Sequence, residues 1–124
     1  MIESELFKYL KDKYIPDLVA GKEYSSFDCY SVKYKMFIEL KCREVHYDTL
    51  LIEKYKYERL IAISLGYGYK PYYINSTPKG IYSFKLDIAP EWISKLLPKT
   101  TEFAENNKIL KQIGYLDIKD AKEL

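Results

Sequence analysis

Apolar and charged positions alternate most regularly along residues 36–43. One parity is apolar and the other carries most of the charge, as the run Met36-Phe37-Ile38-Glu39-Leu40-Lys41-Cys42-Arg43 shows. Successive side chains of a strand point to opposite faces, so this alternation predicts a strand. Glu39 and Lys41 would then stand side by side on one face, while the apolar parity anchors the other.

A second strand is predicted about ten residues earlier. Phe27–Ser31 is short, apolar and aromatic, and it is close enough in sequence to pair antiparallel with 36–43. Asp28 would then lie beside Glu39. The two segments together predict two carboxylates and one lysine at the end of a sheet.

The strand context is what gives Glu39-x-Lys41 its weight. A chain of this composition should contain about three acidic-x-basic triplets by chance, and it contains three. The other two, Asp117-x-Lys119 and Asp120-x-Lys122, lie in a polar tail without strand alternation and are predicted to be solvated.

The remaining pattern predicts helices around this sheet. Leu6 and Leu10 mark the apolar stripe of a helix over residues 2–14, with Ser4 as its cap and Pro16 beyond its end. A first strand is expected within residues 18–26. A second helix is predicted from about Thr49 to Leu65, with Asp48 as N-cap.

The C-terminal half is predicted to continue with a hairpin and two further helices. The predicted segments are a helix stop and turn at 66–69, strands at 72–75 and 81–86 joined by a turn at 76–80, a short helix from Ala89-Pro90 through Leu97 that Pro98 ends, and a helix at 102–113 between a Thr101 cap and Gly114.

Length and composition indicate one globular domain spanning residues 1–124. The chain is 48% apolar and 31% charged, with a formal net charge of +2. No apolar run is long enough to span a bilayer, and the acidic start Met1–Glu5 argues against a signal peptide. We therefore expect a cytoplasmic protein that does not insert in membranes.

Several chemistries are excluded by what the sequence lacks. His46 is the single histidine, and Cys29 and Cys42 are predicted to be free thiols, so there is no recognisable zinc site. The glycines at 66 and 68 lack the spacing of a nucleotide-binding loop, so no nucleotide cofactor is expected. The 14 tyrosines could stack bases, although a general excess of Tyr, Lys and Ile is also typical of AT-rich coding.

On Asp28, the Glu39-Leu40-Lys41 motif and the helix that follows, the chain resembles the PD-(D/E)xK nuclease superfamily, whose members include restriction enzymes and Holliday junction resolvases. The resemblance spans roughly residues 1 to 75. It implies an α/β fold, with a mixed sheet in a restriction-endonuclease-like core of helix, three strands, helix and strand, followed by the C-terminal hairpin and helices.

The resemblance also implies a function, namely metal-dependent hydrolysis of phosphodiester bonds in DNA. Asp28, Glu39 and the backbone carbonyl of Leu40 would bind Mg²⁺, with Mn²⁺ as a substitute, because Mg²⁺ takes oxygen ligands. Lys41 would orient the attacking water and offset charge on the scissile phosphate. Glu5, at the start of the first helix, would complete the acidic cluster.

Other positions are assigned by the same resemblance to DNA contacts. Arg43 shares the strand face with Glu39 and would contact a backbone phosphate. Lys54 and Tyr57 hold the place where related nucleases carry polar residues beside the active site. The small size favours structure-selective cleavage of a junction, flap or end, and the resolvase branch implies a homodimer.

Three alternatives stay open. The residue before Asp28 is Phe27, so the literal Pro16-Asp17 pair is a second candidate for the first motif acid. Glu3 competes with Glu5 for the helix position. The same fold could also serve as a non-catalytic nucleic-acid-binding or interaction module, with the acids and Lys41 forming an internal salt bridge.

Overall fold

The structure is a computed structural model that describes residues 1–98 and 108–124. In these ranges the chain forms two helices, nine strands and one 3₁₀ turn. Their bounds are α1 Glu3–Lys13, β1 Val19–Ala20, β2 Cys29–Ser31, β3 Met36–Cys42, β4 Thr49–Glu53, α2 Lys54–Tyr67, β5 Lys70–Thr77, β6 Gly80–Lys85, β7 Ile93–Pro98, β8 Lys108–Asp117, η1 Ile118–Asp120 and β9 Lys122–Glu123.

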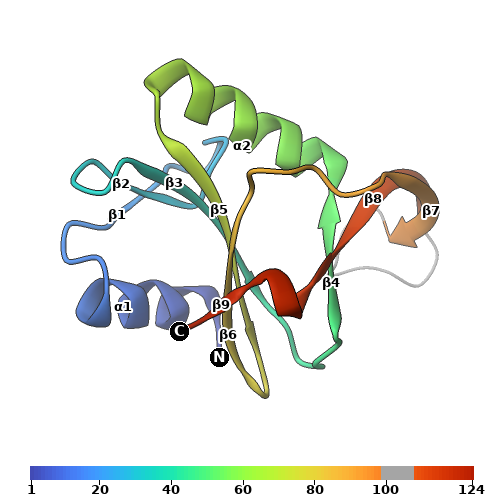
Figure 1. Cartoon of the computed structure of the whole chain (residues 1–124), viewed down its shortest axis with the longest axis horizontal. Coiled ribbons are helices and arrows are strands. Elements are labelled where there is room, and N and C mark those ends of the chain that lie inside the picture. The colour runs from blue at the N-terminus through green and yellow to red at the C-terminus, as the bar shows by residue number, and fades with distance from the viewer. Residues whose placement is uncertain (99–107) are drawn as a thin grey trace.

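The strands form a six-stranded mixed sheet and a three-stranded antiparallel sheet. The order of the larger sheet is β1-β2-β3-β5-β6-β9, and β3 and β5 are its parallel pair. The smaller sheet has the order β4-β8-β7. Figure 1 shows α1 and α2 on opposite sides of the larger sheet, and the two termini close together.

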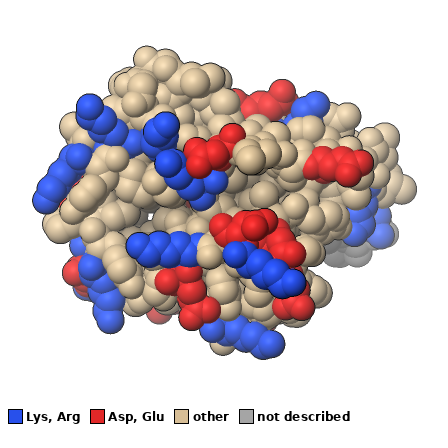
Figure 2. Space-filling view, viewed as in Figure 1, with Lys and Arg blue, Asp and Glu red and all other residues tan. Residues whose placement is uncertain are grey.

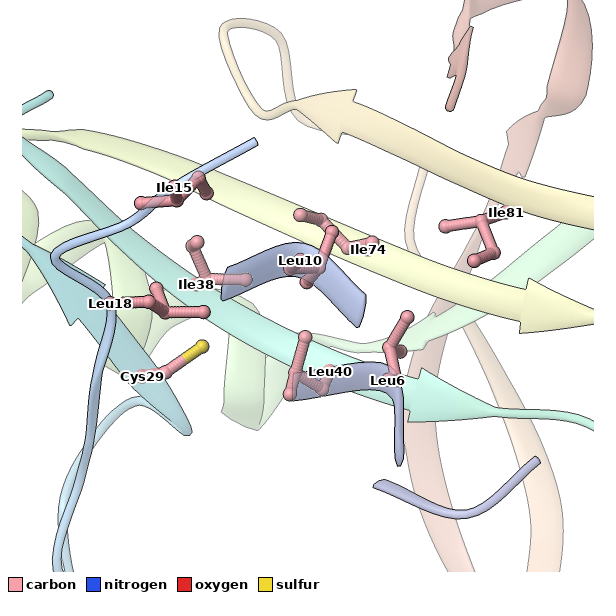
Figure 3. Packing of buried hydrophobic residues seen from close by; sticks show 9 residues of the cluster. All are labelled: Leu6, Leu10, Ile15, Leu18, Cys29, Ile38, Leu40, Ile74 and Ile81. Carbon is pink, nitrogen blue, oxygen red and sulfur yellow. The ribbon is translucent and has the colours of Figure 1, made fainter. Parts of the chain in front are cut away.

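The helix α1 covers one face of the larger sheet with its apolar stripe. Leu6 and Leu10 are fully buried against Ile38 and Leu40 of β3 and Ile74 of β5, as Figure 3 shows. Ile38 and Leu40 therefore point toward α1, as the alternation along residues 36–43 predicts. The opposite parity of β3 is left for the other face.

That other face is covered by α2 and by the strand β4. A second core cluster joins Phe37 of β3, Leu50 and Ile52 of β4, Leu60 of α2 and Tyr73 of β5. Phe37 and Glu39 share one parity of β3, so Glu39 and Lys41 lie on the α2 side of the sheet. Packing on the two faces of the sheet therefore determines that the charged side chains of β3 lie on the side of α2.

The predicted helix over 49–65 is wrong in its first turn. Residues Thr49–Glu53 form β4, which pairs antiparallel with β8. Leu50 and Ile52 are buried while Thr49 is exposed, which is the two-residue period of a strand. The helix starts at Lys54, so Glu53 replaces Asp48 as its N-cap residue.

Both helices predicted at the C-terminal end are wrong where the structure describes them. Ile93–Pro98 is the strand β7, and the described part of the last segment belongs to β8, while residues 101–107 lie outside the described ranges. Apolar pairs such as Leu96 opposite Leu110 join the two strands. A side chain at Gly114 would collide with the ring of Pro90, so this glycine allows close packing and does not end a helix.

The rest of the predicted order is confirmed. The helix α1, a first strand within 18–26, the pair β2–β3 and the hairpin β5–β6 all lie where the pattern placed them. Gly68 ends α2 in the left-handed conformation, at a φ of 71°, as the predicted stop at 66–69 requires. In the described ranges, neither helix has the length and apolar character needed to cross a bilayer.

Candidate active site

Asp28 and Glu39 lie side by side at the start of β2. The backbone N–H of Asp28 donates to the carbonyl of Ile38 at 2.9 Å, which continues the β2–β3 ladder by one residue. The Asp28 carboxylate then accepts from the backbone N–H of Leu40 at 2.7 Å. The Asp28 side chain thus accepts the backbone hydrogen bond that a further β2 residue would otherwise accept from Leu40. This holds the Asp28 carboxylate next to Glu39.

The Glu39 carboxyl lies in a half-buried, negatively charged setting. Burial raises the pKa of Glu39 to about 8, helped by a hydrogen bond to Asp28 and by the negative charge of Asp28. The positive charge of Lys56 acts in the opposite direction. Glu39 therefore binds a proton at a higher pH than an exposed glutamate does.

Lys41 follows Glu39 on the same face of β3 and is half-buried. Burial lowers the pKa of its ammonium group, and the positive charges of Lys56 and Arg43 lower it further. Glu53 and Glu39 oppose this shift. Lys41 is thus a lysine of lowered pKa next to two acids. Such perturbed groups are typical of sites where proton transfer or phosphate binding takes place.

Of the two candidate acids of α1, Glu3 is the one whose pKa responds to the charge of Asp28. Burial and the negative charge of Asp28 raise the pKa of Glu3. Glu5 instead accepts a hydrogen bond from the backbone N–H of Ile2 at 2.8 Å and closes a capping box there. Ile2, not Ser4, is the N-cap. The hydrogen bond from Ile2 holds the Glu5 side chain at the end of the helix, so Glu3 is the better candidate for the site.

The lysine that α2 brings to the acids is Lys56. Its charge affects the pKa of Glu3, Glu39 and Lys41, while Lys54 is not among the charges that shift them. Tyr57 packs edge-on against Trp92 at 5.2 Å between ring centroids. The DNA contacts predicted for Lys54 and Tyr57 stay predictions.

The guanidinium of Arg43 donates hydrogen bonds to three groups inside the protein. Its Nε donates to Asn75 Oδ1 at 2.8 Å, and one Nη donates to the carbonyl of Leu51 at 2.6 Å and to the hydroxyl of Tyr73 at 3.1 Å. These bonds tie β3 and β5 to β4. The geometry gives Arg43 a structural role, and the predicted phosphate contact stays a prediction.

Two residues of β5 complete the floor of the site, and sequence reasoning missed both. Tyr73 and Asn75 are the register partners of Glu39 and Lys41, and both are buried. Burial raises the pKa of Tyr73 to about 12, so its hydroxyl stays protonated and donates to the carbonyl of Leu51 at 2.9 Å. Only the parallel β3–β5 register reveals these neighbours, and no local signal encodes it.

Asp17, the alternative first acid, serves a turn. Its carboxylate accepts from the hydroxyl of Ser31 at 2.6 Å and from the backbone N–H of Lys33 at 2.9 Å. Both bonds lower the pKa of Asp17. This acid stabilises the β2–β3 connection, which leaves Asp28 as the acid beside Glu39.

The histidine and the cysteines lie outside this arrangement. His46 is in the loop after β3, where Nδ1 is 2.8 Å from the Thr77 hydroxyl. Cys29 and Cys42 are free, as predicted. Cys29 is fully buried in the core under α1, and burial raises the pKa of its thiol well above the usual range.

The donor set suits a hard divalent cation. The carboxylates of Asp28 and Glu39 supply oxygen ligands, and a cation between them would offset the repulsion that raises the pKa of Glu39. In a strand the N–H and C=O of one residue point to the same side, so the Leu40 carbonyl lies on the side of Asp28. Within residues 1–98 and 108–124, no three His, Cys, Asp or Glu side chains lie close enough to hold a metal by themselves.

Charge is distributed without a dominant sign on the face that Figure 2 shows. Lys and Arg side chains alternate with Asp and Glu across it, consistent with a net charge of +2. Binding of a polyanion would therefore depend on local groups such as Lys41 and Lys56, and not on the overall field.

The comparisons with known proteins identify the fold. A scan against protein-family models finds no match, and a search of curated proteins finds none either. Among solved structures, the chain is similar to a Holliday junction resolvase, Hjc, from the archaeal hyperthermophile Archaeoglobus fulgidus. The TM-score is 0.64 at 17% sequence identity, over 98% of this chain and 88% of that one.

The chain has the restriction-endonuclease-like fold of that resolvase. This confirms the predicted fold class, a mixed α/β arrangement built on a mixed sheet. The identity is too low to carry over activity or residue roles, so the function is argued below from the geometry of the site.

Proposed function

We propose that this protein is a metal-dependent DNA nuclease of the PD-(D/E)xK type. The observation that carries the proposal is the pairing of Asp28 with Glu39, with Lys41 next to them on the same face of β3. Two half-buried acids side by side, one of them with a raised pKa, next to a half-buried lysine cost stability. Such an arrangement is favoured where it serves chemistry.

Each residue has a definite role in this proposal. Asp28, Glu39 and the Leu40 carbonyl would hold Mg²⁺, or Mn²⁺ in its place, with Glu3 as a further acid at the rim. The bound cation supplies a water of lowered pKa and neutralises charge on the phosphoryl group. Lys41 positions the attacking water by hydrogen bonding and offsets the negative charge that develops on the scissile phosphate.

The substrate proposed is branched or interrupted DNA, such as a junction, a flap or an end. The acids lie at the interior strands β2 and β3, and the fold is that of a junction resolvase. A homodimer remains a prediction. The strands β7 and β8 offer apolar surface for it, since Leu96 and Leu110 pair across them and are 61% and 67% exposed.

A non-catalytic DNA-binding module on the same fold is the second candidate. It is favoured by the absence, within the described residues, of three metal-ligating side chains close together. In that case the acidic pair and Lys41 would form only an internal ion pair. Metal binding at the acids separates the two candidates.

The acidic pair should make stability depend on pH and on metal. Burial raises the pKa of Glu39 from 4.5 to about 8, so the folded protein keeps a proton that the unfolded chain releases. In EDTA the free energy of unfolding should therefore fall as pH rises from about 5 to 8. Mg²⁺ at about tenfold its Kd should add about 1.4 kcal/mol at pH 8 and raise the Tm by roughly 5 °C.

Thermal denaturation with and without Mg²⁺ tests this, with Glu39→Gln as the variant. The amide cannot titrate, so both the pH slope and the metal effect should largely disappear. A Tm that rises with Mg²⁺ equally in Glu39→Gln would show that the metal binds elsewhere.

Two lysines on the first turn of α2 provide a matched pair of variants. Lys56 acts electrostatically on the acids and Lys54 does not, so Lys56→Ala should lower cleavage by about tenfold, as loss of one phosphate-directed charge does. Lys54→Ala should stay within about twofold of wild type. Steady-state cleavage of one labelled DNA measures both, and equal losses would contradict the assignment of Lys56 to the site.

A further inference from the structure

An aromatic hollow lies on the same sheet face as the candidate site. It has a volume of about 400 Å³ between the strands β1–β3 and the end of α2. Five rings line it, and we refer to them as the aromatic hollow: Phe27, Tyr30, Phe37, Tyr67 and Tyr69.

The rings are arranged around a buried floor. Phe37 is 3% exposed, and it stacks on Tyr69 at 5.1 Å between centroids and 29° between planes. Phe27 and Tyr67 contact Phe37 at 4.7 and 5.2 Å. Tyr67 is 65% exposed, so an accessible aromatic wall stands over an apolar floor, as in pockets that bind flat rings.

The hollow adjoins the acidic pair along two segments of chain. Phe37 is two residues before Glu39 on the same face of β3, a distance of about 7 Å at strand geometry. Phe27 directly precedes Asp28. A spacing of about 7 Å equals about two stacked nucleotide steps of one DNA strand, so a base in the hollow would belong to a nucleotide close to the cleaved phosphate.

Hydrogen bonds from Arg59 hold the loop beside the hollow in place, and Lys22 adds a positive charge to its lining. Arg59 of α2 donates to the carbonyl of Tyr24 at 3.3 Å and lies 3.5 Å from the Ser26 hydroxyl, which ties the loop before β2 to the helix. A side chain at Gly21 would collide with Phe27, so this glycine lets β1 approach the ring. Lys22 lines the hollow and offers its charge to a phosphate.

We infer that the aromatic hollow binds an unpaired nucleobase of the DNA substrate, one or two nucleotides from the cleaved bond. Every base presents a π face that can stack on these rings, whereas a base in a continuous duplex is already stacked between its neighbours. The inference rests on the proposed nuclease function and specifies its substrate class. Preferred substrates carry an unpaired nucleotide beside the cleavage point, as a flap or single-stranded tail does.

The test uses the full chain in EDTA and a DNA flap with 2-aminopurine at successive positions in its unpaired arm. Stacking quenches the fluorescence of this base, so titration with wild type should quench it most at one or two nucleotides from the branch. Tyr67→Ala should weaken flap binding by about tenfold, since it removes one stacking wall. Binding of a fully paired duplex should stay within about twofold.

Two control variants separate stacking from general effects. Tyr67→Phe keeps the ring and should bind like wild type. Tyr47→Ala removes a tyrosine that is 60% exposed in the loop between β3 and β4 and does not line the hollow, and it should also bind like wild type.

The outcomes distinguish this inference from the proposed function. Quenching that Tyr67→Ala abolishes supports the hollow as a base site, even if no DNA is cleaved when Mg²⁺ is added. Metal-dependent cleavage without position-specific quenching, or with flap and duplex equally affected by Tyr67→Ala, would overturn the inference and leave the nuclease proposal standing.

Discussion

Replacing Lys41 with methionine should lower the rate of DNA cleavage by about 10²- to 10³-fold, as loss of one group that stabilises transition-state charge does. Methionine keeps most of the side-chain volume and removes the ammonium group. The pKa of Lys41 is lowered by its burial and by Lys56 and Arg43, so the folded protein gains little from its charge. Its removal should therefore leave the Tm unchanged or slightly raised.

Measurement of kcat and KM for Lys41→Met, together with its thermal denaturation, checks this expectation. A loss confined to kcat would show that Lys41 acts on the transition state and not on DNA binding. A variant that is unfolded, or that cleaves at the wild-type rate, would contradict the role assigned to Lys41.

Replacing Arg43 with methionine should lower the free energy of unfolding by about 3 kcal/mol, because the buried Asn75 Oδ1 loses its donor and the Leu51 carbonyl keeps only the Tyr73 hydroxyl. The acceptors are Asn75 Oδ1 and the Leu51 carbonyl, which lose bonds of 2.8 and 2.6 Å. Arg43→Lys should lose about half as much, since one ammonium cannot reproduce the planar fork. Urea denaturation of each variant measures these changes.

Arg59 offers the matched control for Arg43. Its guanidinium bonds to surface groups at 3.2 to 3.5 Å, and Arg59→Met should cost less than about 1 kcal/mol. If Arg43→Met were as stable as wild type and bound DNA with a weaker salt dependence, Arg43 would be the phosphate contact that the sequence first suggested.

The positions of Asp28, Glu39 and Lys41 were predictable because they depend on residues that are close together in the sequence. The alternation along 36–43 sets the face of Glu39 and Lys41, and a short connection sets the register that places Asp28 beside Glu39. The same local character makes the hairpin β5–β6 readable from its alternation and turn residues.

The strands of the smaller sheet could not be predicted in the same way. β4 is short and apolar, and its partner β8 lies near the other end of the chain, with Thr49 opposite Asp117. A short apolar run fits a buried strand or a helix equally well when its partner is unknown. The helix expected from Thr49 therefore absorbed β4.

The choice between Glu3 and Glu5 shows how much depends on one cap. Successive residues of a helix point about 100° apart, so two residues on one turn face very different directions. With Ser4 as the cap, Glu5 is the first helical residue and the better candidate for the site. With Ile2 as the cap, Glu5 closes the capping box and Glu3 faces the acids. Ser4 is the stronger cap by residue type, so sequence alone favours Glu5.

Cleavage of a small panel of labelled DNAs tests the central claim most directly. The panel holds a four-way junction, a flap, a duplex and a single strand, each with Mg²⁺ or Mn²⁺ and with EDTA. Wild type is compared with Asp28→Asn and with Asp17→Asn, which removes the alternative acid that serves the β2–β3 turn. We expect metal-dependent cleavage that Asp28→Asn abolishes and Asp17→Asn retains. A folded, metal-bound protein that cleaves none of the four DNAs would contradict the nuclease proposal and favour a DNA-binding module.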